Sequence, residues 1–319
     1  MREQLQTLDN IPVHFSTEAM LSVNIVLAIV MYGVALGIRP EMFKNILLFP
    51  KAVLLGLFTQ AIVLPAITFL LIILLNQWIT PMIAMGMILV AACPGGIFSN
   101  FLSQLSKANI ELSVSLTAIG TVITPLLTPF NFWLWGSLYI NFVSNHAEEA
   151  LRTLYIDYGQ MFQTVLFLLG LPLLLGFLTV KYVPKVAQNI KKPLRYFSIL
   201  FFIAMAIVAF SNNLDSFWSN TFGYIFFLVL IHNSMILGSG LGLAKLFKLP
   251  EKDQRSLTIE AGIQNSGLGL VLLLNPNIFP PDLAIGGMIH ITSWWWIWHI
   301  ISGLSISFFW SKRVPIDQG

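Results

Sequence analysis

Glu260 is the residue of this sequence best suited to chemistry, because it is the acidic side chain placed deepest within an apolar stretch. It belongs to segment 258–267, which reads Thr-Ile-Glu-Ala-Gly-Ile-Gln-Asn-Ser-Gly. A carboxylate inside the hydrocarbon of a membrane is costly and is functional by default. Gln264 follows four residues later and shares a helix face with Glu260, while Asn265 and Ser266 extend the polar run. The cluster indicates a buried site; the alternative is that Glu260 lies near the membrane surface.

A second apolar stretch contains residues that break a helix. Its middle, 92–100, reads Ala-Cys-Pro-Gly-Gly-Ile-Phe-Ser-Asn. Proline removes a backbone donor and the two glycines release the helical restraint, so the helix should unwind there. Non-helical backbone at membrane depth survives only where it is buried in protein or lines a wet cavity. Ser99 and Asn100 follow at once and supply polar ligands, which favours a functional break over a simple packing kink.

The polar side chains of these stretches suit a hard cation. Ser113 and Thr117 are four residues apart on a further apolar stretch, although such hydroxyls often bond to their own or a neighbouring helix. One carboxylate with amide and hydroxyl oxygens has the low total charge that a monovalent cation such as sodium needs. The candidate donors are Ser99, Asn100, Ser113, Thr117, Glu260 and Gln264. No Cys/His cluster has the spacing of a transition-metal site.

The composition is that of a membrane protein. The chain has 319 residues with 17 Lys and Arg and 14 Asp and Glu, so 10% are charged, where a soluble domain has about 25%. Apolar residues reach 56% and the mean hydropathy is +0.80. These values exclude disordered, coiled-coil and collagen-like classes, and the single cysteine, Cys93, excludes an internal disulfide. No signal peptide is expected at the N-terminus, and no nucleophilic triad, paired carboxylates or phosphate loop indicates an enzyme.

The hydropathy pattern predicts an all-α, polytopic protein with nine transmembrane helices in one domain, 1–319. A span needs roughly 20 apolar residues. The predicted spans are 18–37, 49–75, 81–105, 110–137, 159–181, 196–212, 221–244, 256–274 and 284–310. With the N-terminus outside, every Lys and Arg except Arg2 and Arg152 lies on the inner side, which also places the C-terminus in the cytoplasm. This rule explains the basic charge, so we expect no nucleic-acid partner.

The order of the spans predicts inverted repeats, about 18–138 and 159–310. In this topology the two broken spans run in opposite directions, and each lies between two unbroken spans. Broken helices that cross near the membrane midplane are typical of secondary transporters. Their freed carbonyls bind cations, and the N-terminal ends of the resumed half-helices attract anions.

Four motifs resemble the bile acid:sodium symporter family. They are Ala-Cys-Pro-Gly-Gly-x-x-Ser-Asn at 92–100, Leu-Ser-Val-x-x-Thr at 112–117, Pro-Leu-Leu-Thr-Pro at 125–129 and Leu-Thr-Ile-Glu-x-Gly-x-Gln-Asn-Ser-Gly-Leu at 257–268. The resemblance extends from about residue 24 to residue 309. It implies a core domain and a panel domain, with sodium-coupled uptake by alternating access.

The resemblance also implies two sodium sites and a substrate site. The first sodium site would contain Ser99, Asn100, Ser113, Thr117 and Glu260. The second would contain Gln60, Glu260, Gln264 and the backbone carbonyls of Ala261 and Ile263. The substrate side would contain Ile97, Phe98, Asn265 and Ser266. Ile97 and Phe98 are larger than the residues of many bacterial relatives, so this departure concerns the substrate. The tryptophan-rich segment 293–298 is also bulkier than in relatives, and lipid-facing or interfacial packing is the other explanation for its tryptophans.

The sequence therefore predicts a secondary transporter for sodium and an organic anion, such as a bile acid, pantoate or a keto acid. A proton-coupled carrier with Glu260 as relay is one alternative, and a channel or sensor of the same fold is the other. The expected setting is a lipid bilayer, by default a bacterial cytoplasmic membrane. No obligatory protein partner is indicated.

Overall fold

The computed structural model describes residues 2–9, 17–38, 48–96, 98–144, 158–211, 221–275, 278–279 and 283–315. Within these ranges the chain is helical, and its extended backbone is limited to one isolated bridge. The elements, with two π-helical turns η1 and η3, are α1 Arg2–Asp9, α2 Thr17–Ala35, α4 Pro50–Phe58, η1 Thr59–Val63, α5 Leu64–Leu74, α6 Pro81–Ala92, α7 Phe98–Leu105, α8 Ile110–Ser144, α9 Tyr158–Val165, η3 Leu166–Gly170, α10 Leu171–Tyr182, α11 Pro184–Ser211, α13 Thr221–Leu246, α14 Glu251–Gly262, α15 Ser266–Leu273 and α16 Gly286–Ser311.

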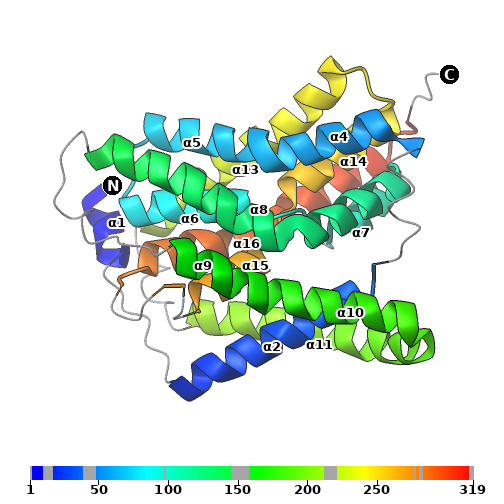
Figure 1. Ribbon diagram of the computed structural model, residues 1–319. Coiled ribbons are helices and arrows are strands. Elements are labelled where there is room, and N and C mark those ends of the chain that lie inside the picture. Colours follow the sequence, from blue (N-terminus) through cyan, green and yellow to red (C-terminus); the bar gives the residue numbers. More distant parts are fainter. Residues whose placement is uncertain are drawn as a thin grey trace.

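The helices form two groups that pack against each other. Helices α2, α10 and α11 lie side by side along the lower edge of Figure 1 and contact one another. The larger group contains α4 to α8 and α13 to α16, with α6 packed on α16 and α13 packed on α14. The groups meet through α9 and η3 against α8, and through α11 against α16.

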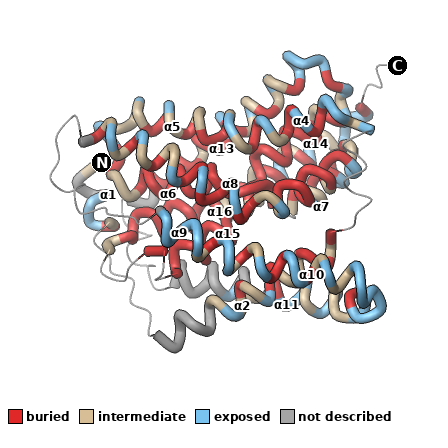
Figure 2. The backbone as a smooth tube through the Cα atoms, in the orientation of Figure 1, coloured by how far each residue is buried: buried red, intermediate tan, exposed pale blue. Residues whose placement is uncertain are grey.

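Burial distinguishes the middle of the larger group from its outside. Helix α15 is buried along its whole length and α6 along most of it (Figure 2). Large apolar side chains are instead exposed on the outer helices, including Leu70 on α5, Phe167 in η3 and Phe227 on α13, which are 60%, 61% and 61% exposed. An apolar exterior on this scale suits a protein whose outer surface contacts lipid.

Each predicted span coincides with a helix or a pair of half-helices. Four helical stretches of the described chain are long and apolar enough to cross a membrane, namely Pro50–Leu74, Ile110–Val143, Phe162–Tyr182 and Gly223–Leu246. The count of nine crossings stays a prediction. The largest difference in boundary is at α11, which begins at Pro184 instead of near residue 196, with Pro193 inside it. The hydropathy window stops at Lys191 and Lys192 because charges interrupt an apolar run without interrupting a helix.

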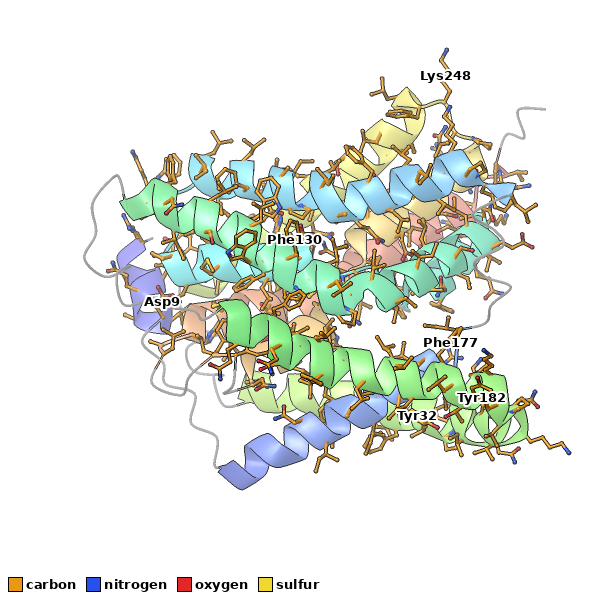
Figure 3. The ribbon with its side chains drawn as sticks, viewed as in Figure 1. Asp9, Tyr32, Phe130, Phe177, Tyr182 and Lys248 are labelled. Carbon is orange, nitrogen blue, oxygen red and sulfur yellow. The ribbon has the colours of Figure 1, made fainter. Side chains whose placement is uncertain are left out.

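The two ends of the bundle differ in charge. Figure 3 shows Asp9 at the end opposite to Lys248 and Tyr182. Asp9 ends the short helix α1, which sequence analysis did not predict, and its Oδ1 accepts a hydrogen bond of 3.0 Å from Thr80 Oγ1 at the start of α6. Burial raises the pKa of the Asp9 carboxyl to about 7, against the opposing effect of this hydrogen bond. Helix α1 therefore docks a carboxyl group at one end of the bundle.

At the other end, the buried guanidinium of Arg255 joins three helices. Its Nη1 donates to the carbonyls of Ser106, Trp310 and Arg313 over 2.8, 3.2 and 3.2 Å. Its Nη2 forms a 2.6 Å ion pair with Glu251. A cation is favourable at helix C-termini because the last carbonyls there lack partners within the helix. Arg255 thus connects the end of α7 and the end of α16 to the first turns of α14.

Candidate functional site

Both predicted breaks are present, and they cross each other in the middle of the larger helix group. Helix α6 ends at Ala92 and α7 begins at Phe98, while α14 ends at Gly262 and α15 begins at Ser266. Gly95 and Gln264 form an antiparallel bridge. Gly96 N donates to Ile263 O over 2.8 Å, and Asn265 N donates to Pro94 O over 2.7 Å. The breaks therefore satisfy part of each other's backbone hydrogen-bonding groups, as buried non-helical backbone must.

Glycine at position 95 makes room for the acidic side chain of the other break. A Cβ atom at Gly95 would collide with Glu260 Oε1 and would lie 2.8 Å from Gln60 Nε2. The first break thus brings its backbone close to the carboxylate of the second. This is a close approach that any residue with a side chain prevents.

Hydroxyl groups from two helices surround the Glu260 carboxylate, which is 1% exposed. Ser99 Oγ, at the start of α7, lies 2.5 Å from Oε2. From α8, Thr117 Oγ1 donates to Oε1 over 2.9 Å and Ser113 Oγ lies 3.3 Å from Oε2. The structure therefore brings together a carboxylate and three hydroxyls that are far apart in the sequence.

Asn100 completes this cluster of oxygens. Its Oδ1 accepts from Ser113 Oγ over 2.9 Å and lies 3.2 Å from Thr117 Oγ1. Ser103, which sequence analysis did not single out, donates to Ser113 Oγ over 3.1 Å. All five residues predicted for the first sodium site are thus neighbours. Oxygen atoms of low total charge are the donors that a hard cation prefers.

Gln60 and Gln264, the two side-chain amides predicted for the second sodium site, are both buried. Gln60, in the π-helical turn η1, places Nε2 3.5 Å from both Glu260 O and Glu260 Oε1. Gln264 has no hydrogen-bond partner for either atom of its side-chain amide. A buried amide without partners is unfavourable by about 1–3 kcal/mol per group. An oxygen-seeking cation at this position would remove the penalty for Oε1, so the residues present fit the second predicted site.

The backbone at the end of α14 agrees with the same prediction. Ala261 and Ile263 flank Gly262, the last helical residue. The carbonyl of Ile263 accepts from Gly96 N, and a carbonyl oxygen has a second lone pair for a further partner. Helix ends leave such carbonyls available. The geometry is therefore compatible with carbonyl ligands from Ala261 and Ile263.

The predicted substrate residues are less closely grouped. Asn265 caps α15, because its Oδ1 accepts from Leu268 N over 3.2 Å, and its side chain is partly exposed. Ser266 is fully buried and its Oγ lies 3.3 Å from His299 Nδ1. Phe98 is partly exposed at the start of α7, and Ile97 lies outside the described residues. Phe98 and Asn265 thus mark the beginnings of the two resumed half-helices, whereas Ser266 faces the protein interior.

The tryptophans of segment 293–298 pack on helix α13. The rings of Trp294 and Trp298 lie 5.9 and 5.2 Å from the ring of Phe226, and Trp295 lies 4.6 Å from His232. Trp295 is fully buried. These contacts are internal packing, and they differ from the lipid-facing role that bulky residues in a membrane helix suggest.

Sequence analysis missed two side chains that bind the ends of the interrupted helices. Thr128 Oγ1 donates to Ala92 O, the last carbonyl of α6, over 2.9 Å. Asn233 Nδ2 donates to Gly262 O, the last carbonyl of α14, over 2.9 Å. Both are buried polar residues in apolar helices. The signal available in the sequence was a polar residue within an apolar stretch, because a polar group inside a membrane helix needs a partner.

These features belong to a known class of membrane transporter. The family described as sodium bile acid symporter family matches residues 24–220 of the chain. A Bacillus subtilis (strain 168) protein named uncharacterized sodium-dependent transporter YocS is 30% identical over 93% of this chain and 85% of its own length. The chain belongs to the sodium bile acid symporter family, which confirms the resemblance seen in its motifs.

More distant relatives come from plants and animals. The probable sodium/metabolite cotransporter BASS1, chloroplastic, of Oryza sativa subsp. japonica is 26% identical over 91% of the chain. Sodium/bile acid cotransporter 4 of Mus musculus is 28% identical over 82% of it. The chain covers 66% and 57% of the lengths of these two proteins. Family and relatives together support sodium-dependent transport across a membrane as the general activity.

Proposed function

We propose that this protein couples the uptake of an organic anion to the entry of sodium by alternating access. The observation that carries the proposal is the buried cluster of carboxylate, amide and hydroxyl oxygens at the crossing of two broken helices. Relatives named as sodium-dependent transporters support it. A proton relay needs one titratable group, and the additional oxygens around Glu260 would serve no purpose in it. No catalytic role is proposed.

Two sodium ions would bind on opposite sides of Glu260. The first is surrounded by Ser99, Asn100, Ser113 and Thr117, whose oxygens already lie within hydrogen-bond distance of the carboxylate or of one another. The second is assigned to Gln60, Gln264 and the carbonyls of Ala261 and Ile263. Because both sites share one carboxylate, occupation of one site screens its charge for the other. The ions would also fix the two crossing segments relative to each other.

The anion is assigned to the beginnings of α7 and α15. A helix N-terminus has free N–H groups and a positive partial charge, so it attracts carboxylates. Phe98 and Asn265 lie at these positions and are partly exposed. The substrate class is therefore a small organic carboxylate or a bile acid-like anion, with Phe98 favouring an apolar portion beside the anionic group. Inward release would follow from movement of the larger helix group against α2, α10 and α11.

The first test is uptake by proteoliposomes that contain the purified protein. Taurocholate, pantoate and pyruvate are supplied outside with an inward sodium gradient, and choline replaces sodium in the control. Sodium-driven accumulation of one anion is expected, with loss of the sodium dependence in Glu260→Ala and altered substrate affinity in Asn265→Ala. Sodium dependence that persists unchanged in Glu260→Ala would contradict the proposal.

A proton-coupled carrier remains the second candidate because Glu260 is a buried carboxyl group. The same vesicles distinguish the two, since an inward proton gradient without sodium drives uptake only in that case. Passive, gradient-independent flux would indicate a channel.

The proposed setting is a bacterial cytoplasmic membrane, crossed nine times by two inverted repeats. The basic ends of α10, α13 and α14, with Lys181, Lys248 and Lys252, would face the cytoplasm, and α1 with Asp9 would face outward. Cysteine labelling at the exposed positions 6 and 248 with an impermeant reagent on intact cells tests this. Labelling from outside is expected at residue 6 alone.

A further inference from the structure

The amide of Asn233 joins helix α13 to the second break and to helix α16. Asn233 is fully buried. Its Nδ2 donates to Gly262 O over 2.9 Å, and its Oδ1 accepts from Ser302 Oγ of α16 over 2.7 Å. Both polar atoms of the side chain are therefore used, and each contacts a different helix.

The carbonyl that Asn233 binds is the last one of the half-helix α14. The final carbonyls of a helix have no partner within it, and no water is available deep in a bilayer to replace that partner. Two neighbouring carbonyls already have partners, since Glu260 O accepts from Gln60 Nε2 and Ile263 O accepts from Gly96 N. Asn233 supplies the partner for Gly262 and so fixes the orientation of the peptide that follows it.

Gly262 O fixes which way this amide faces, and Ser302 holds the amide in that orientation. A carbonyl oxygen only accepts, so the amide nitrogen must face Gly262 O. Oδ1 is then turned toward α16, where it accepts from Ser302 Oγ. The hydroxyl also lies 3.2 Å from His299 O in its own helix, so it stays within reach of two acceptors.

The surrounding packing leaves little freedom at this point. A Cβ at Gly262 would collide with Leu237 of α13, and a Cβ at Gly303 of α16 would lie 2.6 Å from Ile263 Cδ1. Helices α13 and α16 are thus in direct contact with the end of α14. On the far side of the break, His299 of α16 lies against Ser266 at the start of α15. Helix α16 therefore contacts the chain on both sides of the second break.

We propose that Asn233, held in place by Ser302, is a positioning residue for sodium at the second break. This inference rests on the proposed function, because it concerns the ion assigned to Gln264 and to the carbonyls of Ala261 and Ile263. Gly262 lies between those two carbonyls, so the peptide plane that Asn233 holds determines where they point. Asn233 contacts no ion itself and acts through the backbone of Gly262. Sodium affinity therefore depends on a hydroxyl group in α16 that lies outside the ion sites.

The test measures sodium binding without any organic substrate. Purified protein in detergent is titrated with NaCl against choline chloride at constant ionic strength, and intrinsic tryptophan fluorescence gives the midpoint. The melting temperature is measured separately in choline alone. We expect the sodium midpoint to rise about tenfold in Asn233→Leu and about threefold in Ser302→Ala, on the scale of a lost hydrogen bond. Ser302→Thr, which keeps the hydroxyl, should stay within about twofold of the wild type.

Ser305→Ala is the matched control. Ser305 lies one turn further along α16, and its hydroxyl bonds to Ile301 O of its own helix over 2.8 Å. Its sodium midpoint should equal that of the wild type. If Asn233→Leu fails to fold, Ser302→Ala decides alone, because it removes a single oxygen from a helix surface.

Two results would overturn the inference. One is a wild-type midpoint in Ser302→Ala and in any folded Asn233→Leu; the other is a lower melting temperature in choline with no change in the midpoint. A wild-type protein without any response to sodium would instead contradict the proposed function, and this inference with it.

Discussion

The two breaks bridge each other but contribute different things to the site. The first, between α6 and α7, contains Pro94, Gly95 and Gly96 and has no acidic or basic residue. The second, between α14 and α15, follows Glu260 and contains Gln264. One break supplies space and hydroxyl groups, and the other supplies charge. The crossing works only as a pair, since the carboxylate of one break occupies the volume that the glycine of the other leaves open.

Their supports differ as well. Side chains of α8 bind on both sides of the first break, through Thr128 at Ala92 O and Thr117 beside Ser99. Two helices, α13 and α16, share this role at the second break through Asn233 and His299. Helix α16 also packs on α6 and α7, so it contacts both broken helices.

The largest expected effect comes from filling the space in the first break. In Gly95→Ala the new methyl group meets Glu260 Oε1 and Gln60 Nε2, so the carboxylate must move away from its hydroxyl partners. We expect sodium-driven uptake to fall about 100-fold, which corresponds to about 2.7 kcal/mol of lost binding. Uptake in proteoliposomes at fixed sodium measures it.

Gly96→Ala is the control for this substitution. A Cβ there would lie 3.3 Å from Gln264 O, which a small shift relieves, so a loss below about tenfold is expected. Equal losses of uptake in both variants would show that the first break tolerates no side chain at either glycine. This would contradict the specific role of Gly95 in leaving room for the Glu260 carboxylate.

A smaller effect is expected from removing one hydroxyl of the oxygen cluster. Thr117→Val keeps the side-chain shape but deletes the 2.9 Å hydrogen bond to Glu260 Oε1. We expect the sodium midpoint to rise about tenfold. Thr121→Val is the matched control one turn away, because the Thr121 hydroxyl bonds to Thr117 O of its own helix over 2.7 Å. Identical sodium midpoints in the two variants would show that Thr117 is not part of the sodium site.

Thr128→Val allows a direct comparison of the side chains that bind the last carbonyls of α6 and α14. This variant deletes the hydrogen bond to the last carbonyl of α6, as Asn233→Leu does for α14. Because Thr128 acts on the break without charge, its sodium midpoint should rise only about threefold, less than the tenfold of Asn233→Leu. The same fluorescence titration measures both variants. A larger rise of the sodium midpoint in Thr128→Val than in Asn233→Leu would show that sodium binding depends more on the first break than on the second.

The smallest effect concerns the outer end of the first broken helix, where Asp9 meets Thr80. Burial raises the pKa of Asp9 to about 7 from 3.8, so the folded protein prefers the neutral carboxyl group. Its contribution to stability is fully present below pH 3.8 and is lost as the pH rises through 7. Asp9→Asn should therefore flatten the fall in melting temperature between pH 4 and pH 8. Parallel pH profiles of wild type and variant would contradict this.

The sequence was sufficient for the class, the breaks and most of the oxygen cluster, and the reasons are local. Proline, glycine and a lone glutamate are unusual in apolar surroundings, so segments 92–100 and 258–267 could be recognised from the sequence. The place of Gln60 came from resemblance alone, since a single polar residue in a long apolar helix gives no spacing to interpret. Asn233 and Thr128 were missed because their role depends on which carbonyl lies opposite, which is decided only by helix packing. Ser266 was assigned to the substrate through the resemblance, and the structure buries its side chain beside His299.

Arg255 gives the last turn of α16 an unexpected importance. Two of its three carbonyl partners, Trp310 and Arg313, belong to the end of α16 and the residues just beyond it. A protease cut that ends the chain before residue 310 would remove both of these acceptors from a buried guanidinium. Such a cut should therefore reduce expression and shelf life although it leaves the residues around Glu260 untouched, whereas a cut after residue 315 leaves those carbonyls in place.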